Sequence, residues 1–426
     1  MKKIRVSKKN TNLQTQIKLP SSKSISNRLL MMRSLEREKL HFDNLSEAED
    51  TYMMRLYLSF INTCADSVIP LNLDAHNAGT VFRFLTAYLS QKAGKYLLTG
   101  FERMKQRPVG KLVDALRTLG ANIRYTEKEN YPPLLIKGTR LVSKDIEIDA
   151  GSSSQFISAL MLIAPHLPQG LRILLKGNIV SKSYINMTAE LMRNFGIAVH
   201  MDDQIIEVKP GAYSIKPFRV ESDWSSASFW YQMVAFLPQA EVLLPGLQKN
   251  SLQGDRFLAE VFATLGVKTE FLDNSIFISH HGKPEQQIDF DFTDAPDIVP
   301  SVMTTCAALG VKAKFRGIEH LRIKESDRIA TMQEELAKIG AHIVKEEDAY
   351  HLIPGQKPSA SLVFDSHGDH RLAMCLAPLA LKFDKVEILH PEVVNKSYPN
   401  YWNDLEKSGI FDLETTEIEE PKNEIE

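Results

Sequence analysis

The sequence predicts an α/β or α+β protein of two similar lobes, built from about six copies of one unit. Three observations support this prediction. The chain has 426 residues, more than one hydrophobic core usually supports. A polar helix start followed by an apolar helix recurs along it, and an amphipathic helix ending at glycine follows most of these recurrences.

The first kind of helix begins at a Ser-, Gly- or Asp-bearing segment and has little polar face. Its six starts are marked by Ser24, Gly79, Ser154, Ser226, Asp297 and Asp369. The successive spacings are 55, 75, 72, 71 and 72 residues. Helices that are apolar on all sides are buried ones, so each unit is expected to contain one buried helix.

The second kind is an amphipathic helix that runs through a glycine into a β-branched strand. The glycines are Gly120, Gly196, Gly266, Gly340 and, more weakly, Gly409. Glycine suits this place because a helix C-cap often needs positive φ. The first unit is short: only one helix, at about 47–61, lies between Arg28 and Asn77, and the strand expected after it is missing.

The repeat also predicts the domain boundaries. A boundary near 220–223 separates an N-terminal lobe of three units, 21–221, from a C-terminal lobe of three units, 222–410. Residues 1–20 precede the first unit and are expected to pair with the C-terminal lobe. The remaining segment, 411–426, carries seven acids against one lysine, and such a composition predicts a disordered tail.

Composition bounds the function and the compartment. The net charge of −2 gives no overall basic field for nucleic acid. Cys64, Cys306 and Cys375 lie far apart without metal-ligand spacing, so reduced thiols are expected. The basic N-terminus has no apolar region behind it, and no apolar run approaches the 18 residues of a membrane span. These features predict a cytoplasmic protein that binds neither membrane nor nucleic acid.

The helix starts predict a site for a small polyanion. If three buried helices lie side by side in each lobe, their positive N-termini can converge on the cleft between the lobes. Lys23, Arg28, Arg83 and Arg371 stand at such starts, and further cations lie in the glycine-led turns. A collection of cations in a chain of net charge −2 indicates a focused anion site rather than a general basic surface.

Two carboxylates stand within this cationic set. Asp297 follows a proline at a helix start, and Glu325 lies between Lys324 and Arg328. Such carboxylates can shuttle protons; the alternative interpretation is that one caps a helix and the other pairs with a cation. The sequence contains neither GxxxxGK[ST] nor GxGxxG, and the two histidines of the HGDH segment do not make a metal site.

The segments LPSSKSISNR, NAGT-x-x-R, RMKQRPVG, SSQF, SKSY, KESDR, GDHR and NKSYP occur in this order. Together they resemble the 5-enolpyruvylshikimate-3-phosphate (EPSP) synthase family, over about residues 15–408. The resemblance implies a two-lobed inside-out α/β barrel of six βαβαββ units, the first truncated here. It also implies the reaction: the 5-hydroxyl of shikimate 3-phosphate attacks phosphoenolpyruvate, and the tetrahedral intermediate loses phosphate. No metal or organic cofactor takes part, and a monomer is expected.

The resemblance also implies the roles of individual residues. Shikimate 3-phosphate is expected to bind Lys23, Ser24, Arg28, Ser153, Ser154, Gln155, Ser181, Asp297 and Lys324, with Tyr184 nearby. Phosphoenolpyruvate is expected to bind Lys23, Gly79, Arg107, Gln155, Arg328, Arg371 and Lys396. The expected catalytic residues are Asp297 as the base for the hydroxyl, with Glu325 and Lys23 handling protonation and the leaving group.

Three departures from the family pattern bear on affinity and stability. The first unit lacks about a strand pair, His320 replaces a common asparagine, and Phe84 replaces proline or leucine. Two alternatives to this function exist. The sister transferase acting on UDP-N-acetylglucosamine has a loop cysteine that 103–108 lacks. A non-catalytic anion-binding paralogue would have no need of Lys23, Asp297 and Glu325.

Overall fold

The computed structural model describes residues 2–36, 41–63, 69–151, 153–355 and 362–417. The chain forms two compact units. Unit 1 comprises Met1–Pro20, Glu221–Ser251 and Asp255–Glu426, and unit 2 comprises Ser21–Val220 with Leu252–Gly254. The chain thus leaves unit 1 after Pro20 and returns at Glu221, where the backbone N–H of Asp223 donates to the Pro20 carbonyl at 2.8 Å.

Unit 2 contains two four-stranded sheets of one topology, β3-β4-β6-β5 and β7-β8-β10-β9. The first two strands of each sheet are parallel and the other pairs are antiparallel. The strands are β3 (Leu71–Asp74), β4 (Lys95–Thr99), β5 (Asn122–Tyr125), β6 (Leu134–Lys137), β7 (Ile146–Asp149), β8 (Leu171–Lys176), β9 (Val199–Met201) and β10 (Ile205–Val208). The helices are α1 (Lys23–Glu36), α2 (Glu49–Thr63), α3 (Gly79–Gln91), α4 (Glu102–Lys105), α5 (Gly110–Thr118), α6 (Ser154–Ile163), η1 (Ala164–His166) and α7 (Lys182–Asn194).

Unit 1 contains three four-stranded sheets, β12-β13-β11-β2, β14-β15-β17-β16 and β18-β19-β1-β20. The strands are β1 (Lys2–Lys8), β2 (Asn12–Gln16), β11 (Gln239–Pro245), β12 (Val267–Leu272), β13 (Ser275–His280), β14 (Gln287–Asp291), β15 (Lys312–Arg316), β16 (His342–Glu346), β17 (Ala349–Ile353), β18 (Leu362–Asp365), β19 (Lys385–Leu389) and β20 (Phe411–Glu417). The α-helices are α8 (Trp224–Phe236), α9 (Leu258–Thr264), α10 (Val299–Leu309), α11 (Arg328–Ala337), α12 (His370–Leu376), α13 (Ala380–Phe383) and α14 (Tyr401–Lys407). The 3₁₀ turns are η2 (Gly254–Phe257), η3 (Pro296–Ile298), η4 (Glu319–Ile323), η5 (Ala377–Leu379) and η6 (Pro391–Lys396).

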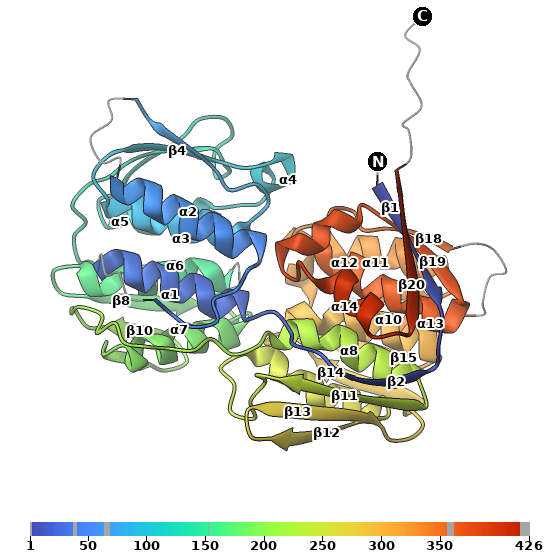
Figure 1. The fold of residues 1–426 in the computed structure, drawn as a ribbon. Helices are drawn as coiled ribbons and strands as arrows, with labels where there is room; N and C mark the ends of the chain where they lie inside the picture. Colours follow the sequence, from blue (N-terminus) through green and yellow to red (C-terminus); the bar gives the residue numbers. More distant parts are fainter. Residues whose placement is uncertain (1, 37–40, 64–68, 152, 356–361, 418–426) are drawn as a thin grey trace, which may run out of the picture. The chain divides into compact units, whose positions relative to one another are not determined.

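The five sheets repeat one βαβαββ pattern, which confirms the predicted α/β class. The first copy of the repeat lies in unit 2 and has α1 and α2. Among the described residues, its strands are reduced to a single bridge between Asp43 and Arg219. The N-terminal strands complete two sheets of unit 1. In Figure 1 the blue strand β1 lies beside β19 and β20, and β2 lies beside β11.

The predicted apolar helices form the centre of each unit. In unit 2, α1, α3 and α6 contact one another, and in unit 1, α10 contacts α8 and α12. Every residue of α8 and of α12 is buried. Two hydrophobic cores result, one in each unit. Because these helices are covered on all sides, only their ends can present polar groups to a ligand.

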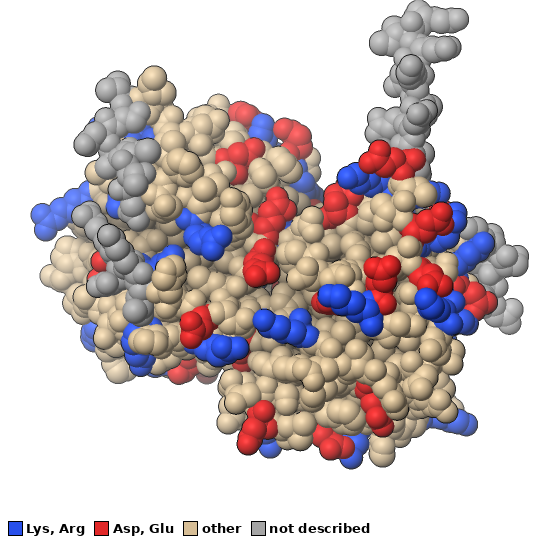
Figure 2. All heavy atoms as spheres, in the orientation of Figure 1, with Lys and Arg blue, Asp and Glu red and all other residues tan. Residues whose placement is uncertain are grey.

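The prediction of disorder from Phe411 is wrong for 411–417. These residues form β20, which pairs antiparallel with β1 from Lys2↔Glu417 to Lys8↔Phe411. The acids that suggested disorder face basic partners: Arg5 lies 2.7 Å from Glu414 and Lys9 lies 2.9 Å from Asp412. In Figure 2 acidic and basic side chains are interspersed over this sheet. Residues 418–426 lie outside the described part of the chain.

Candidate active site

Lys23 and Asp50 form a nearly buried ion pair at the starts of α1 and α2. Lys23 Nζ lies 2.9 Å from Asp50 Oδ2, and the two side chains are 17% and 5% exposed. A buried carboxylate needs such a partner, because water is not there to solvate it. The pair therefore fixes the Lys23 ammonium at the N-terminal end of α1, beside the half-buried Ser24.

Arg28 is a buried cation whose recorded hydrogen bonds all go to neutral acceptors. Its Nε donates to Thr188 Oγ1 at 2.7 Å and its Nη2 to Ser158 Oγ at 3.2 Å. Backbone carbonyls of Ser24 and Tyr184 accept the remaining bonds. Burial lowers the pKa of Arg28 to about 10, so the guanidinium is still charged at neutral pH. Neutral acceptors leave this positive charge available to an anion. The sequence did not reveal Thr188 and Ser158 as its partners.

The starts of α3 and α6 are joined by hydrogen bonds through Gln155. Its Oε1 accepts from Arg83 Nη1 at 2.7 Å, and its Nε2 donates to Thr80 Oγ1 at 3.1 Å. Ser153 caps α6, since its hydroxyl accepts from the Gln155 backbone N–H. Ser154 is buried at the first position of this helix.

Gly79 leaves room for two arginines. A Cβ at this position would lie 2.3 Å from Arg83 Nη1 and 2.7 Å from Arg107 Nη2. Both guanidinium side chains are buried, and Arg107 also donates to the Asn77 carbonyl at 3.2 Å. Glycine therefore lets the two guanidinium groups approach the backbone closely, and a larger residue would displace them.

Ser181 precedes α7 with a left-handed backbone, φ 55°, although it is not glycine. It is 4% exposed. Non-glycine residues in this region are strained and are concentrated at functional sites. The same helix carries Tyr184 and Thr188, whose contacts hold Arg28. Unit 2 thus brings its predicted phosphate-binding residues to the starts of neighbouring helices.

Arg328 in unit 1 contacts three carboxylates. Its Nη1 donates to Asp297 Oδ1 at 3.0 Å, its Nη2 to Glu325 Oε2 at 3.0 Å, and its Nε to Asp369 Oδ2 at 2.7 Å. Arg371 Nη2 lies 2.9 Å from the second oxygen of Asp297. Asp297 is therefore held between two arginines, and the two predicted acid/base residues share one guanidinium.

The Asp297 carboxylate is strongly stabilised in its charged form. Burial would raise its pKa, but the charges of Arg371, Lys324 and Arg328 outweigh burial and hold the pKa well below its usual range. Lys324 is half-buried beside this group, and Lys396 ends η6, which packs against α12. A carboxylate with such a low pKa is a weak base until its cationic partners are drawn away.

His320, one of the departures from the family pattern, adds no charge to this cluster. Burial and the neighbouring Lys324 lower its pKa to about 3, so the imidazole is neutral. Its Nε2 is buried with no hydrogen-bond partner among the described residues. A neutral imidazole can replace an asparagine as a polar group that carries no charge.

Asp255 is an acid that the sequence did not single out. It lies in η2, and its Oδ2 accepts a hydrogen bond from Ser225. Its Oδ1 is buried without a partner in the described structure. Burial, together with the negative charge of Asp297, raises its pKa to about 7. Only the tertiary structure shows this, since an isolated acid after glycine has no distinguishing sequence pattern.

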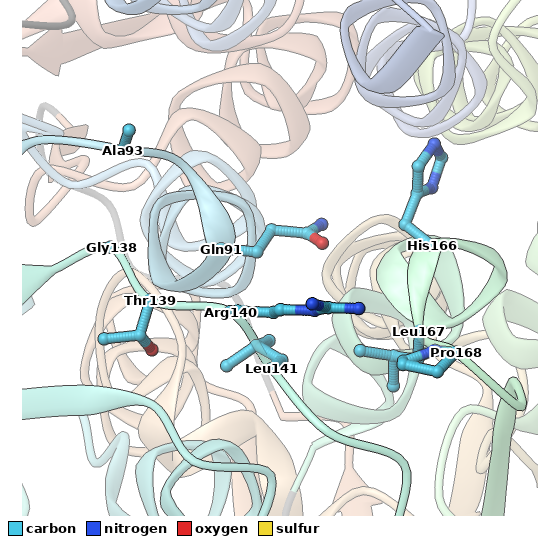
Figure 3. Close-up of a pocket in the computed structure, with 9 residues that line it drawn as sticks. All are labelled: Gln91, Ala93, Gly138, Thr139, Arg140, Leu141, His166, Leu167 and Pro168. Atoms are coloured by element: carbon cyan, nitrogen blue, oxygen red, sulfur yellow. The ribbon is translucent and has the colours of Figure 1, made fainter.

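An open cavity of about 460 Å³ in unit 2 does not coincide with any predicted site residue. It is lined by residues including Gln91, Arg140 and His166 (Figure 3). Gln91 ends α3, and His166 ends η1, which follows α6. The predicted residues Gly79 and Ser154 lie at the opposite ends of α3 and α6. The residues predicted to bind anions are therefore not the ones that line this cavity.

The chain matches the family model described as EPSP synthase (3-phosphoshikimate 1-carboxyvinyltransferase) over residues 7–405. The chain belongs to the EPSP synthase family. A 3-phosphoshikimate 1-carboxyvinyltransferase of Bacteroides fragilis strain YCH46 is 44% identical over 403 residues, 94% of this chain and 96% of that protein. One from Vibrio cholerae strain M66-2 is 36% identical over 409 residues, 91% of this chain and 95% of that protein.

Solved structures agree with this membership at the level of the fold. The EPSP synthase of Acinetobacter baumannii covers 98% of this chain and 100% of its own, with a TM-score of 0.77 and 21% identity. As an EPSP synthase, the chain transfers the carboxyvinyl group of phosphoenolpyruvate to shikimate 3-phosphate in aromatic amino acid biosynthesis. The sister transferase considered from the sequence is therefore excluded. Among the described helices, none is both long and apolar enough to cross a membrane.

Replacing Asp255 by asparagine is expected to change how stability depends on pH. The pKa of this carboxyl is about 7 in the folded protein and 3.8 without burial. The folded state thus binds the proton more tightly, and its stability is lost as pH rises from about 4 to 7. Asparagine cannot ionise, so the melting temperature of Asp255→Asn relative to wild type should rise across this window and level off above it. The exposed Asp273→Asn serves as the control. A pH-independent difference for Asp255→Asn would contradict the raised pKa.

Proposed function

We propose that the residues predicted from the sequence bind the two substrates. In this proposal shikimate 3-phosphate is bound by Lys23, Ser24, Arg28, Ser153, Ser154, Gln155, Ser181, Asp297 and Lys324. Phosphoenolpyruvate is bound by Lys23, Gly79, Arg107, Gln155, Arg328, Arg371 and Lys396. The observation that carries the proposal is the cluster in which Asp297 lies between Arg328 and Arg371. It combines the two functions that this reaction needs, anion binding and proton transfer.

Asp297 acts as the base for the attacking hydroxyl. Two arginines stabilise its charge and make it a poor proton acceptor. When the carboxylate and phosphate of phosphoenolpyruvate bind Arg328 and Arg371, they compete with Asp297 for these donors. The pKa of Asp297 then rises toward a value at which it can accept the proton. Substrate binding and base activation are thus one event.

Glu325 and Lys23 complete the proton transfers. Glu325 is 12% exposed and shares Arg328 with Asp297, so loss of that arginine to the substrate also raises its proton affinity. It can then protonate C3 of phosphoenolpyruvate in the addition step and take a proton back from the resulting methyl group when phosphate leaves, while Asp297 passes the hydroxyl proton to the departing phosphate. Lys23, oriented by Asp50, stabilises the charge that develops on the departing phosphate. No step in this scheme needs a group that the chain does not supply.

Asp297→Asn tests the base. The amide preserves the shape of the side chain but cannot accept the proton, so phosphate release should slow by about 10²- to 10⁴-fold. Affinity for shikimate 3-phosphate, measured by calorimetry, should change much less. The control is Asp289→Asn, which removes a surface acid paired with Arg316. Turnover near that of the parent would remove Asp297 from the base role.

Arg371→Ala tests the assignment of this arginine to phosphoenolpyruvate. Steady-state kinetics with each substrate varied in turn should show a larger increase in KM for phosphoenolpyruvate than for shikimate 3-phosphate. Arg316→Ala, which removes a half-exposed arginine at the end of β15, provides the comparison. A larger effect on shikimate 3-phosphate would place Arg371 on the other ligand.

We also propose a cytoplasmic monomer that needs no metal or organic cofactor. Cys306 and Cys375 are buried thiols, and burial raises the pKa of Cys306 above its usual range and that of Cys375 to about 12. They are therefore unreactive and suited to a reducing compartment. Light scattering should give the mass of one chain, 48.1 kDa, and dialysis against a chelator should leave turnover unchanged. A larger particle would contradict the monomer. A loss of activity after dialysis would contradict the claim that no metal is needed.

A further inference from the structure

Glu335 is a fully buried carboxylate outside the group of predicted site residues. It lies on α11, the helix that begins at Arg328, and is 0% exposed. Its Oε1 lies 2.8 Å from His367 Nε2. Its Oε2 accepts from Lys338 Nζ at 2.7 Å and from the Asp365 backbone N–H at 3.1 Å. Three donors thus offset the cost of burying this charge.

One of these donors, His367, lies in the turn that joins β18 to α12, and another, the Asp365 amide, belongs to the last residue of β18. His367 and Gly368 both have positive φ, 49° and 69°, and the Asp369 N–H donates to the Ser366 carbonyl at 2.8 Å. This is the geometry of a type I′ turn. Residues other than glycine rarely adopt the left-handed region, and the contact between the His367 imidazole and Glu335 helps to hold the turn.

The turn leads directly into the Arg328 cluster. Asp369 caps α12, where its Oδ1 accepts from the Arg371 backbone N–H at 3.0 Å. Its Oδ2 accepts from Arg328 Nε at 2.7 Å. The contacts therefore close a ring: from Arg328 along α11 to Glu335, across to His367, through the turn to Asp369, and back to Arg328.

We propose that Glu335 is a positioning residue for the two arginines assigned to phosphoenolpyruvate. By holding His367 and the Asp365 amide, Glu335 fixes the turn before α12. The turn orients the Asp369 carboxylate toward Arg328, and it also sets where α12 begins and therefore where Arg371 lies. Glu335 acts through these neighbours and does not touch substrate. The inference rests on the proposed roles of Arg328 and Arg371.

A divalent metal is the other interpretation of this cluster. Ligand atoms of Glu334, Glu335 and His367 lie within 4.8 Å of one another. However, the Lys338 ammonium already lies 2.7 Å from Glu335 Oε2, and its positive charge opposes a cation there. Glu334 is a poor third ligand, since its side chain is 64% exposed and lies 3.9 Å from His367. The observed contacts thus favour the positioning role.

Glu335→Gln tests the proposal because it keeps the shape but turns one acceptor oxygen into a donor. Misplacement of reacting groups by about 1 Å can cost 10²-fold in rate. We expect kcat/KM for phosphoenolpyruvate to fall roughly 10- to 100-fold, with KM for shikimate 3-phosphate changed less. The neighbouring Glu334→Gln is the matched control and should behave as wild type.

His367→Gly is the second variant, since glycine adopts positive φ without strain and the fold is preserved. It removes only the imidazole, so the same selective effect on phosphoenolpyruvate should appear in a variant that still unfolds in one cooperative thermal transition. The double variant with Glu335→Gln should be less impaired than the product of the single effects, as expected for one chain of contacts.

The following outcomes would overturn the proposal. Equal loss for both substrates, or wild-type kinetics in His367→Gly, would show that the ring is structural only. If a chelator abolished turnover of the wild-type protein but not that of His367→Gly, the cluster would be a metal site. If Arg371→Ala in the same series left KM for phosphoenolpyruvate unchanged, the proposed function itself would fail. Wild-type kinetics in Glu335→Gln beside an impaired Arg371→Ala would refute the positioning role alone.

Discussion

The burial of Arg328 is the constraint on which the arrangement of unit 1 depends. This guanidinium is 1% exposed, and a charge so far from water is tolerated only with charged hydrogen-bond partners. Burial alone would lower its pKa, but Asp369, Glu325 and Asp297 raise it above the ordinary value. The three carboxylates come from η3, from the segment before α11 and from the start of α12. Satisfying one cation therefore brings three distant segments together.

Unit 2 stabilises its own buried arginine without carboxylates. Arg28 is also buried, but hydroxyls and backbone carbonyls solvate it instead of acids. Its pKa falls to about 10 as a result, whereas that of Arg328 rises. An anionic substrate gains more from a cation whose charge is not already neutralised. This contrast fits the roles proposed for the two arginines: Arg28 offers charge for binding, and Arg328 holds carboxylates that substrate binding can release for proton transfer.

The repeat explains where the chemistry lies. In each complete βαβαββ copy, a strand runs into a helix that is buried along its length, so the helix start is the place where polar groups can be exposed to a ligand. Gly79, Ser154 and Asp369 occupy equivalent starts. The truncated first copy keeps this feature, because α1 still carries Lys23 and Arg28 although its sheet is reduced to one bridge in the described structure. In the described residues, the reduced sheet leaves this proposed ligand-binding end intact.

The sequence by itself determined the α/β class, the repeat, the buried helices and the residues at their starts, because helix periodicity, caps and glycines are local patterns. It led to a wrong interpretation of 411–417, since the acids there are neutralised by β1, about 400 residues away. It also missed Thr188 as the partner of Arg28, 160 residues distant, and the roles of Asp255 and Glu335. Only tertiary structure decides such features: burial and long-range pairing set the charge state of a side chain, and neither follows from its neighbours in the sequence.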